Sequence, residues 1–454
     1  MSGLNVALNT AVSGLFANQR AIAATSENIA NVNTADYARR EAKFFTDAIP
    51  NQFAGVDVNI VRSAVDRFLQ SAAYRGAADA ASSRAVAEAL RRVEASLGAP
   101  GDDLSFANEL DNAFAALTTL AANPSSLAAK ADAVAALDAA FSAFSRTRAA
   151  IATEINAADS QIALDIDRAN ALLKEVWRLN SVVEGSDGAA DLLDARLSEL
   201  SKLVSITVTR NERGQVEVTA GGQVLANAGG YTALGYAPGT PARLTLSSVD
   251  PESGAQTQIS ADFGGSVASG EIRGLLDLRN IELPRLDGVV AGAARGVADQ
   301  MNAVYALNVP VGATAPDASY GALIVEDSGG NFSVNAAIAG DPSRFAVARP
   351  GPGGAGGAND GTGAALLADL AASSQADDVR QAVGLIGSAS ANAARAAESN
   401  TALANELSAR AATQSGVNLD EELSNLILYQ RAYGANARVI AAIDEMWQAL
   451  VSIL

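Results

Sequence analysis

Apolar residues recur every seven positions at both ends of the chain. Such a heptad repeat predicts a helix with one narrow apolar seam that needs another helix to cover it. The sequence therefore predicts two terminal helices that form a coiled-coil-like pair, although the period leaves open whether each seam packs within the chain or against other subunits. The seam residues are Leu8, Leu15, Ile22 and Ile29 at one end, and Leu419, Leu426, Tyr433, Ile440, Trp447 and Leu454 at the other.

Polar residues mark where these two helices are expected to stop and start. The amino-terminal helix should end near residues 31–33, because the Asn, Thr and Asp side chains of this stretch compete with helical hydrogen bonds. The carboxy-terminal helix should begin after Asn418, which can cap it, with Asp420, Glu421 and Glu422 beside the positive end of its dipole. We expect the terminal helices to occupy residues 1–40 and 415–454.

Composition divides the middle of the chain into a helical part and a β-rich part. Residues 41–203 and 364–414 are rich in alanine, which has the highest helix propensity and fills little volume, so they predict an α-helical bundle domain. Residues 204–363 predict a small β-rich outer domain, because short segments alternate apolar and polar residues between glycine turns. Within it we expect a helix near 270–307 and a Gly/Pro-rich linker at 350–363. The expected fold class is mainly α with an inserted β region.

Missing residue types exclude much catalytic chemistry. The chain has no histidine and no cysteine, so it offers no structural zinc site, disulfide, thiol nucleophile or Ser-His triad. Two carboxylates can still serve a glycoside hydrolase. However, no such pair stands out from the solvated charges of long helices. We expect no enzyme activity, cofactor or metal, and we keep a wall-degrading hydrolase as the alternative from another class.

A glycine-rich stretch formally matches a dinucleotide-binding pattern. Residues 351–356 fit G-x-G-x-x-G, but no strand precedes them, and Pro350 and Pro352 interrupt the turn that such a site requires. The stretch also resembles a calcium-binding nonapeptide repeat, except that Ala358 stands where the ligand aspartate belongs and no second copy follows. A linker is the preferred interpretation.

Charge and hydropathy exclude two common kinds of partner. The formal net charge of -18 opposes binding to nucleic acid and to anionic lipid surfaces, both of which are bound by clustered Lys and Arg. The sequence has no uninterrupted apolar run of about 18 residues that would span a bilayer. Its first residues lack the basic region of a conventional signal peptide, so we expect any export to use another route.

Motifs at both ends resemble those of the flagellar axial proteins, the family of rod, hook and hook-associated subunits. Three internal segments, 123–125, 191–196 and 274–279, are similar to the hook-associated protein 1 branch, which forms the hook–filament junction. Another axial subunit, such as a hook, rod or second junction protein, is the nearest alternative. The family usually has glycine where Asp36 stands. The matching residues are Asn28, Asn31, Asn33, Thr34 and Tyr37 at one end, and Ser415, Gly416, Asn418, Asp420 and Glu421 at the other.

The resemblance implies a structural subunit of the bacterial flagellum, outside the cell. It implies self-association in a ring, with the terminal helices packed in an inner tube and disordered in the monomer. The implied partners are the hook protein, the second hook–filament junction protein and a flagellar export chaperone that holds the carboxy-terminal helix. It also implies unfolded passage through the flagellar type III export apparatus without a cleavable signal peptide.

Overall fold

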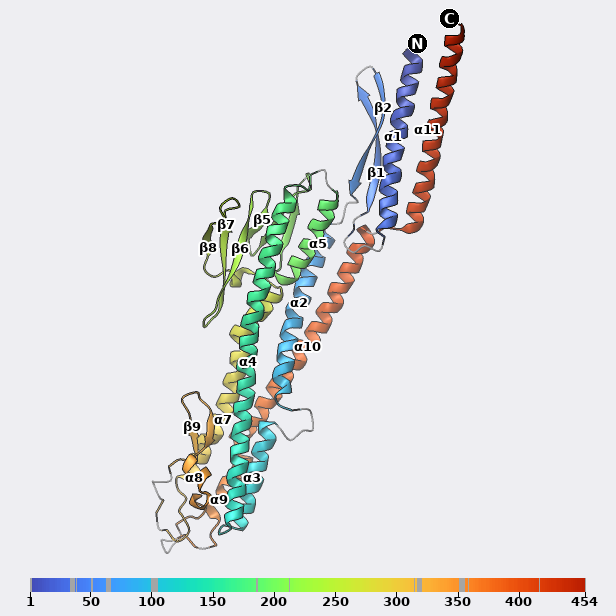
Figure 1. Ribbon diagram of the computed structural model, residues 1–454. Coiled ribbons are helices and arrows are strands. Elements are labelled where there is room, and N and C mark those ends of the chain that lie inside the picture. Colours follow the sequence, from blue (N-terminus) through green and yellow to red (C-terminus); the bar gives the residue numbers. More distant parts are fainter. Residues whose placement is uncertain are drawn as a thin grey trace.

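The protein forms a long helical rod with both termini at one end and two β excursions along its side (Figure 1). The computed structural model describes residues 2–32, 37, 39–49, 52–62, 67–98, 105–184, 187–211, 213–313, 315–316, 321–350, 356–357, 359–415 and 417–453. Six residues of the Gly/Pro-rich linker expected at 350–363, residues 351–355 and 358, lie outside the described residues. The fold class is mainly α with an inserted β region, as the sequence predicts.

The two ends of the chain pair at one end of the rod. Helix α1 (Ser2–Ala30) lies beside helix α11 (Leu419–Ile453), and a β-hairpin packs on α1 (Figure 1). Its strands, β1 (Arg40–Ile49) and β2 (Gln52–Arg62), pair antiparallel.

The hairpin corrects the assignment of residues 41–62 to the α-helical bundle domain. Its period of two is visible in the sequence, since Val56, Val58 and Ile60 alternate with Asp57 and Asn59. The alanine-rich helices that follow dominate the composition of this range and conceal the short alternating segment.

Six long helices build the rod. The 54 residues of α4 form one uninterrupted helix that runs past both β excursions. Serine hydroxyls start two of the helices: Ser105 Oγ accepts a hydrogen bond from the N–H of Asn108, and Ser126 Oγ accepts one from the N–H of Ala129. The helices are α2 (Arg67–Ala95), α3 (Phe106–Ala122), α4 (Leu127–Asn180), α5 (Asp187–Leu203), α7 (Leu283–Tyr305) and α10 (Ser374–Ser415).

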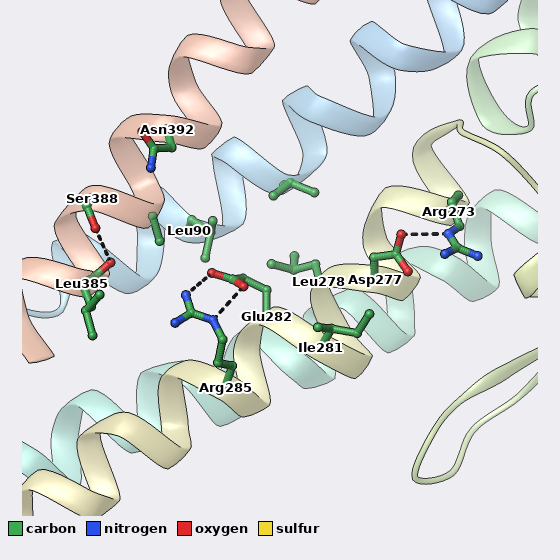
Figure 2. Close-up of a pocket in the computed structure, with 12 residues that line it drawn as sticks. Leu90, Arg273, Asp277, Leu278, Ile281, Glu282, Arg285, Leu385, Ser388 and Asn392 are labelled. Carbon is green, nitrogen blue, oxygen red and sulfur yellow. Dashed lines mark hydrogen bonds and ion pairs between the residues drawn. The ribbon is translucent and has the colours of Figure 1, made fainter.

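A π-helical turn interrupts the helix that enters the rod from the β-rich region. Helix α6 (Glu271–Asp277) continues through the π-turn η2 (Leu278–Glu282) directly into α7, within the range where the sequence predicts a helix. A π-turn inserts one extra residue and redirects the side chains around it. Here η2 faces α2 and α10 across an open space (Figure 2).

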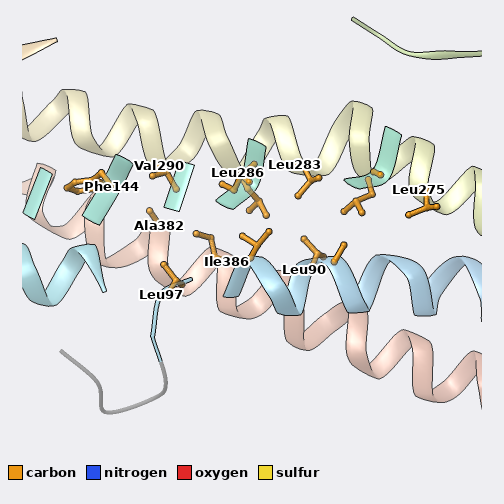
Figure 3. Close-up of a cluster of buried hydrophobic side chains, with 14 of the residues drawn as sticks. Leu90, Leu97, Phe144, Leu275, Leu283, Leu286, Val290, Ala382 and Ile386 are labelled. Atoms are coloured by element: carbon orange, nitrogen blue, oxygen red, sulfur yellow. The ribbon is translucent and has the colours of Figure 1, made fainter. Parts of the chain in front are cut away.

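The core of the rod is a continuous cluster of leucine, isoleucine, valine, phenylalanine and alanine side chains. Leu90 of α2, Leu286 of α7 and Ile386 of α10 meet in its centre (Figure 3). Helices α2 and α10 run antiparallel and close together, because a Cβ on Gly76 would lie only 3.3 Å from the Cα of Ala404. Small residues thus replace bulky ones where these two helices leave the bundle.

The larger β excursion is a six-stranded antiparallel sheet whose strands follow one another in chain order. Val218, Leu225, Leu234 and Leu246 are buried in the cluster that the sheet shares with α4. The strands are β3 (Thr207–Arg210), β4 (Val216–Ala220), β5 (Gln223–Asn227), β6 (Gly230–Ala237), β7 (Arg243–Val249) and β8 (Gln256–Ser260).

The smaller excursion lies at the far end of the rod. It contains strands β9 (Ile324–Glu326) and β10 (Phe332–Val334) and the short helices α8 (Ala336–Gly340) and α9 (Thr362–Ala368). Short 3-10 turns lie at Gly264–Ser266, Pro342–Arg344 and Asp369–Ala372.

Asparagine side chains join helices or the π-turn to extended segments in a recurring geometry, which we call the asparagine clamp. In each clamp the side-chain Oδ1 accepts a hydrogen bond from the N–H of one residue while Nδ2 donates to the C=O of that same residue. All of these bonds measure 2.8 or 2.9 Å. The clamps seen in the described part of the chain pair Asn28 with Arg40, Asn170 with Leu234, Asn180 with Val216, Asn280 with Ala242, and Asn302 with Ile324.

Candidate assembly interface at the terminal helices

Helices α1 and α11 run antiparallel and approach closely through small residues. Gly14 lies against Asn436, and a Cβ on Gly14 would come within 2.8 Å of Asn436 Nδ2. Further along, Asn28 meets Glu422. The buried apolar side chains of α1 are alanines, between α11 on one side and the hairpin on the other: Ala11, Ala17, Ala21 and Ala24.

The larger heptad residues lie at the flank of this contact and not in its centre. Leu8, Leu15, Ile22 and Ile29 are each half-buried, as are Leu426, Ile440 and Trp447. Tyr433 is 37% exposed and Leu419 is 42% exposed. Among the described apolar side chains of α11, Ile443 is the buried one. Leu454 lies outside the described residues.

A second row of apolar residues on α11 is exposed. Leu428, Val439 and Met446 are 60%, 46% and 47% exposed. Their spacings of 11 and 7 residues place them on one face of the helix, and we call them the α11 stripe. Phe16 of α1 and Phe45 of β1 are also exposed. An unpaired apolar row of this kind indicates a surface that another protein covers.

A buried polar cluster, which we call the polar junction, holds the base of the terminal pair. Asn28 is fully buried; its Oδ1 accepts a bond from the Tyr37 hydroxyl at 2.9 Å, and its Nδ2 donates to Glu422 Oε2 at 2.9 Å. Glu422 is 2% exposed and accepts a second bond from Arg39 Nε at 2.7 Å. A buried carboxylate requires such partners, because an uncompensated charge in the interior is costly.

The electrostatics of the polar junction favour the ionised form of Arg39. Burial alone would lower the pKa of this guanidinium, but hydrogen bonds from it to Glu421 and Glu422, and the charges of these carboxylates, raise its pKa above the ordinary value. Burial and the nearby charge of Glu422 raise the pKa of Tyr429, whose ring packs 5.7 Å from that of Phe44 in the hairpin. Arg39 is therefore held in its charged form and Tyr429 in its neutral form.

Arg40 connects the terminal pair to the rod. Its guanidinium is bonded to Glu27 of α1, lies 3.5 Å from Asp191 Oδ2 of α5, and stacks over the Tyr37 ring at 5.6 Å. One side chain therefore contacts the end of α1, the motif that follows it and helix α5.

The motif residues divide between the polar junction and its surroundings. Asn28 and Tyr37 belong to it, and Glu421 bonds Arg39 at its edge. Asn31 Nδ2 bonds the Glu27 carbonyl, and Asn418 caps α11 by accepting from the Asp420 N–H at 3.1 Å. Asp420 is exposed and Ser415 is the last residue of α10, while Asn33, Thr34 and Gly416 lie outside the described residues.

Sequence reasoning missed the central roles of Glu422, Arg39 and Arg40. The signal was present, because two adjacent arginines follow the first motif and three acids open the second. Nothing in either segment alone indicates that Arg39 and Glu422 meet across 383 positions of the chain.

Other kinds of site are not found in the described part of the chain. Its Asp and Glu residues form no cluster of three that could hold a metal ion. None of the described helices is long and apolar enough to cross a membrane.

Three models of protein families match the chain. Residues 90–315 match the helical domain of flagellar hook-associated protein FlgK, residues 8–37 match the flagella basal body rod protein, and residues 410–453 match the carboxy-terminal part of the flagellar basal body rod FlgEFG proteins. The two terminal matches cover the paired helices described above.

Individual relatives and a solved structure agree with these models. Flagellar hook-associated protein 1 of Escherichia coli is 23% identical over 98% of this chain and 99% of its own, and that of Bacillus subtilis is 23% identical over 100% and 99%. The Salmonella typhimurium protein is 26% identical over 66% of this chain, which spans 56% of that relative. The flagellar hook junction protein FlgK from Burkholderia pseudomallei has the same fold, with a TM-score of 0.60 at 14% identity over 76% of this chain and 99% of that structure. The chain therefore belongs to the flagellar hook-associated protein 1 family, within the larger family of flagellar rod, hook and hook-associated subunits.

Proposed function

We propose that this protein is a structural subunit of the bacterial flagellum that forms the junction between hook and filament by self-assembly through its terminal helices. The observation that carries the proposal is the distribution of apolar residues on α1 and α11. Small residues fill the contact between the two helices, while the α11 stripe and Phe16 stay exposed. A monomer that leaves its larger side chains outside its own contact is suited to cover them with neighbours.

The driving force would be burial of this surface in an inner tube. Removing apolar area from water stabilises an assembly by about 25 cal/mol per Å². Residues 1–40 and 415–454 would order fully only on assembly, and the helical and β-rich parts would form the outer layers. The polar junction would set the direction of the rod relative to the tube, because Arg40 bonds both α1 and α5.

The proposed partners follow from the same surfaces. Copies of this chain would form a ring that contacts the hook protein on one side and the second junction protein on the other. An export chaperone would cover Leu426, Tyr433, Ile440 and Trp447 before assembly. The absence of cysteine would allow unfolded export through the type III apparatus without disulfides to break. Unchanged chaperone binding after deletion of residues 419–454 would refute the chaperone assignment.

Complementation of a strain that lacks the gene tests the assembly role. The strain should make hooks without filaments and release flagellin as monomer, and the wild-type gene should restore filaments. The variant Leu428→Asp/Met446→Asp should be secreted but should not restore them. Leu366→Asp, which changes an exposed leucine at the far end of the rod, is the control and should restore them.

Two results would contradict the proposal. Missing hooks in the deletion strain would make the protein a rod or hook component. Normal filaments in that strain would remove it from the junction altogether.

A further inference from the structure

A cavity of about 650 Å³ opens between α2, α10 and the π-turn of the rod (Figure 2). Half of the residues that line it are apolar and half are polar or charged, Ser388 and Asn392 of α10 among the latter. Arg273, Asp277, Glu282 and Arg285 stand at its polar edge. The apolar wall residues include Val86, Leu90, Leu278, Ile281, Leu385 and Ala389.

The π-turn holds one wall of the cavity in place. Arg279 Nε bonds Asp159 Oδ1 of α4 at 2.8 Å, and Asn280 clamps Ala242 beside the large sheet. These bonds fix the side of the turn that faces the sheet. Leu278, Ile281 and Glu282 line the cavity, and Ile281 is 61% exposed there. The opening is therefore preformed and presents an apolar side chain that nothing in the monomer covers.

The edge of the cavity is electrically neutral. Arg273 Nε pairs with Asp277 Oδ2 at 2.8 Å, and Arg285 Nη2 pairs with Glu282 Oε1 at 2.6 Å. Two copies of a chain with a net charge of -18 repel each other over most of their surfaces. Because the charges at the edge of the cavity cancel in pairs, two copies that meet there do not repel each other at that edge.

The matching feature is the outer face of α4. Leu164 is 63% exposed, and Ser160, Ala157 and Thr153 are exposed on the preceding turns. Spacings of four, three and four residues align these side chains in one row. The row carries no charge, and its small members allow a neighbouring surface to approach closely while Leu164 projects.

This row and the cavity lie at the same height on different sides of the rod. Asp159, between Ala157 and Ser160 of the row, bonds Arg279 of the π-turn that lines the cavity. Helices α2 and α7 lie between α4 and α10. A projection on one side and a recess on another, at equal height, is the arrangement that joins identical subunits head to tail around a ring.

We propose that the α4 row of one copy docks into the cavity of its neighbour, with Leu164 as the anchor that packs on Ile281. The contact rests on the proposed ring assembly and adds a second, outer connection to the one made by the terminal helices. It is a heterologous interface, since each subunit offers a projection to one neighbour and a recess to the other.

Disulfide formation tests the contact directly, because the chain has no cysteine of its own. In flagella assembled from Leu164→Cys/Ile281→Cys, mild oxidation should give covalent dimers and higher multimers, and the secreted monomer should give none. Leu164→Cys/Leu403→Cys is the matched control, because Leu403 of α10 is 53% exposed and lies outside the cavity. Equal multimer yields from the two pairs, or none from the first pair in assembled flagella, would overturn the proposal.

A charge substitution gives an independent readout. Leu164→Glu should be secreted normally and should assemble filaments that shed several-fold more readily under shear, whereas Leu403→Glu should behave as wild type. Filament retention equal to wild type in Leu164→Glu would overturn the outer contact alone. Failure of the junction role itself would instead appear in the gene deletion, where filaments would persist.

Discussion

Replacing Asn180 by alanine should destabilise the rod by about 3 kcal/mol. Asn180 is the last residue of α4 and is 1% exposed; its Oδ1 accepts from the Val216 N–H and its Nδ2 donates to the Val216 C=O, both at 2.8 Å. Val216 is itself buried, so the variant removes two partners from groups that water reaches poorly. Each such loss costs about 1–3 kcal/mol.

The expected change in melting temperature follows from the size of the unit that unfolds. For roughly 300 residues unfolding together, at about 2.1 cal/mol/K per residue, a loss of about 3 kcal/mol lowers Tm by about 5 °C. Thermal unfolding of the full chain, followed by circular dichroism, measures it. Asn156→Ala on the exposed side of α4 is the matched control and should change stability by less than about 0.5 kcal/mol.

An aspartate at position 180 tests whether the donor and the acceptor of the clamp both matter. Asn180→Asp keeps the acceptor for the Val216 N–H but places a second oxygen against the Val216 C=O. At neutral pH it should be less stable than Asn180→Ala, and it should recover in acid, where a protonated carboxyl can donate to that carbonyl. A Tm for Asn180→Ala within 1 °C of the Asn156→Ala control would refute the clamp argument.

Two further predictions concern the interior of the rod. Burial raises the pKa of Asp165, and burial with the charge of Asp165 raises the pKa of Glu271. A carboxyl whose pKa is raised in the folded state destabilises the fold at pH values above that pKa. Asp165→Asn should therefore have a higher Tm than wild type at pH 8, and the difference in Tm should shrink as the pH falls through that pKa. A difference in Tm that does not change with pH would contradict this. Gly274→Ala should lower the free energy of unfolding by about 1–3 kcal/mol, because the added Cβ would lie 2.8 Å from the Ser82 carbonyl oxygen. Gly384→Ala, whose Cβ would meet nothing within 4 Å, should raise it slightly. Urea titrations measure both, and equal effects of the two substitutions would refute the packing argument.

The terminal helices could be predicted from periodicity, but the side chains that meet between them could not. Hydropathy favours leucine and isoleucine as contact residues, yet Gly14 lets the backbones approach so closely that alanine and asparagine fill the space. The seven-residue repeat indicates which side chains should be buried. It does not indicate which neighbouring segment or subunit buries them.

Features that depend on contacts between distant segments could not be predicted from the sequence. The polar junction brings Arg39 and Glu422 together from opposite ends of the chain, and local patterns carry no information about that distance. The π-turn Leu278–Glu282 lines the cavity, and no composition rule marks a π-turn. The hairpin could have been found from the alternation of Val56, Val58 and Ile60.

The asparagine clamps give the β excursions attachments to the rod that do not depend on salt concentration or pH. The hydrogen bonds of a neutral amide are not weakened when salt screens charges, and the amide does not change its protonation state between acid and alkaline pH. Ion pairs on the same rod, such as Arg295 with Glu326, do not have this property. Solutions of low salt, high salt, acid pH and alkaline pH therefore act alike on these bonds. A rod pinned to its side domains by amides would keep its shape through all of them.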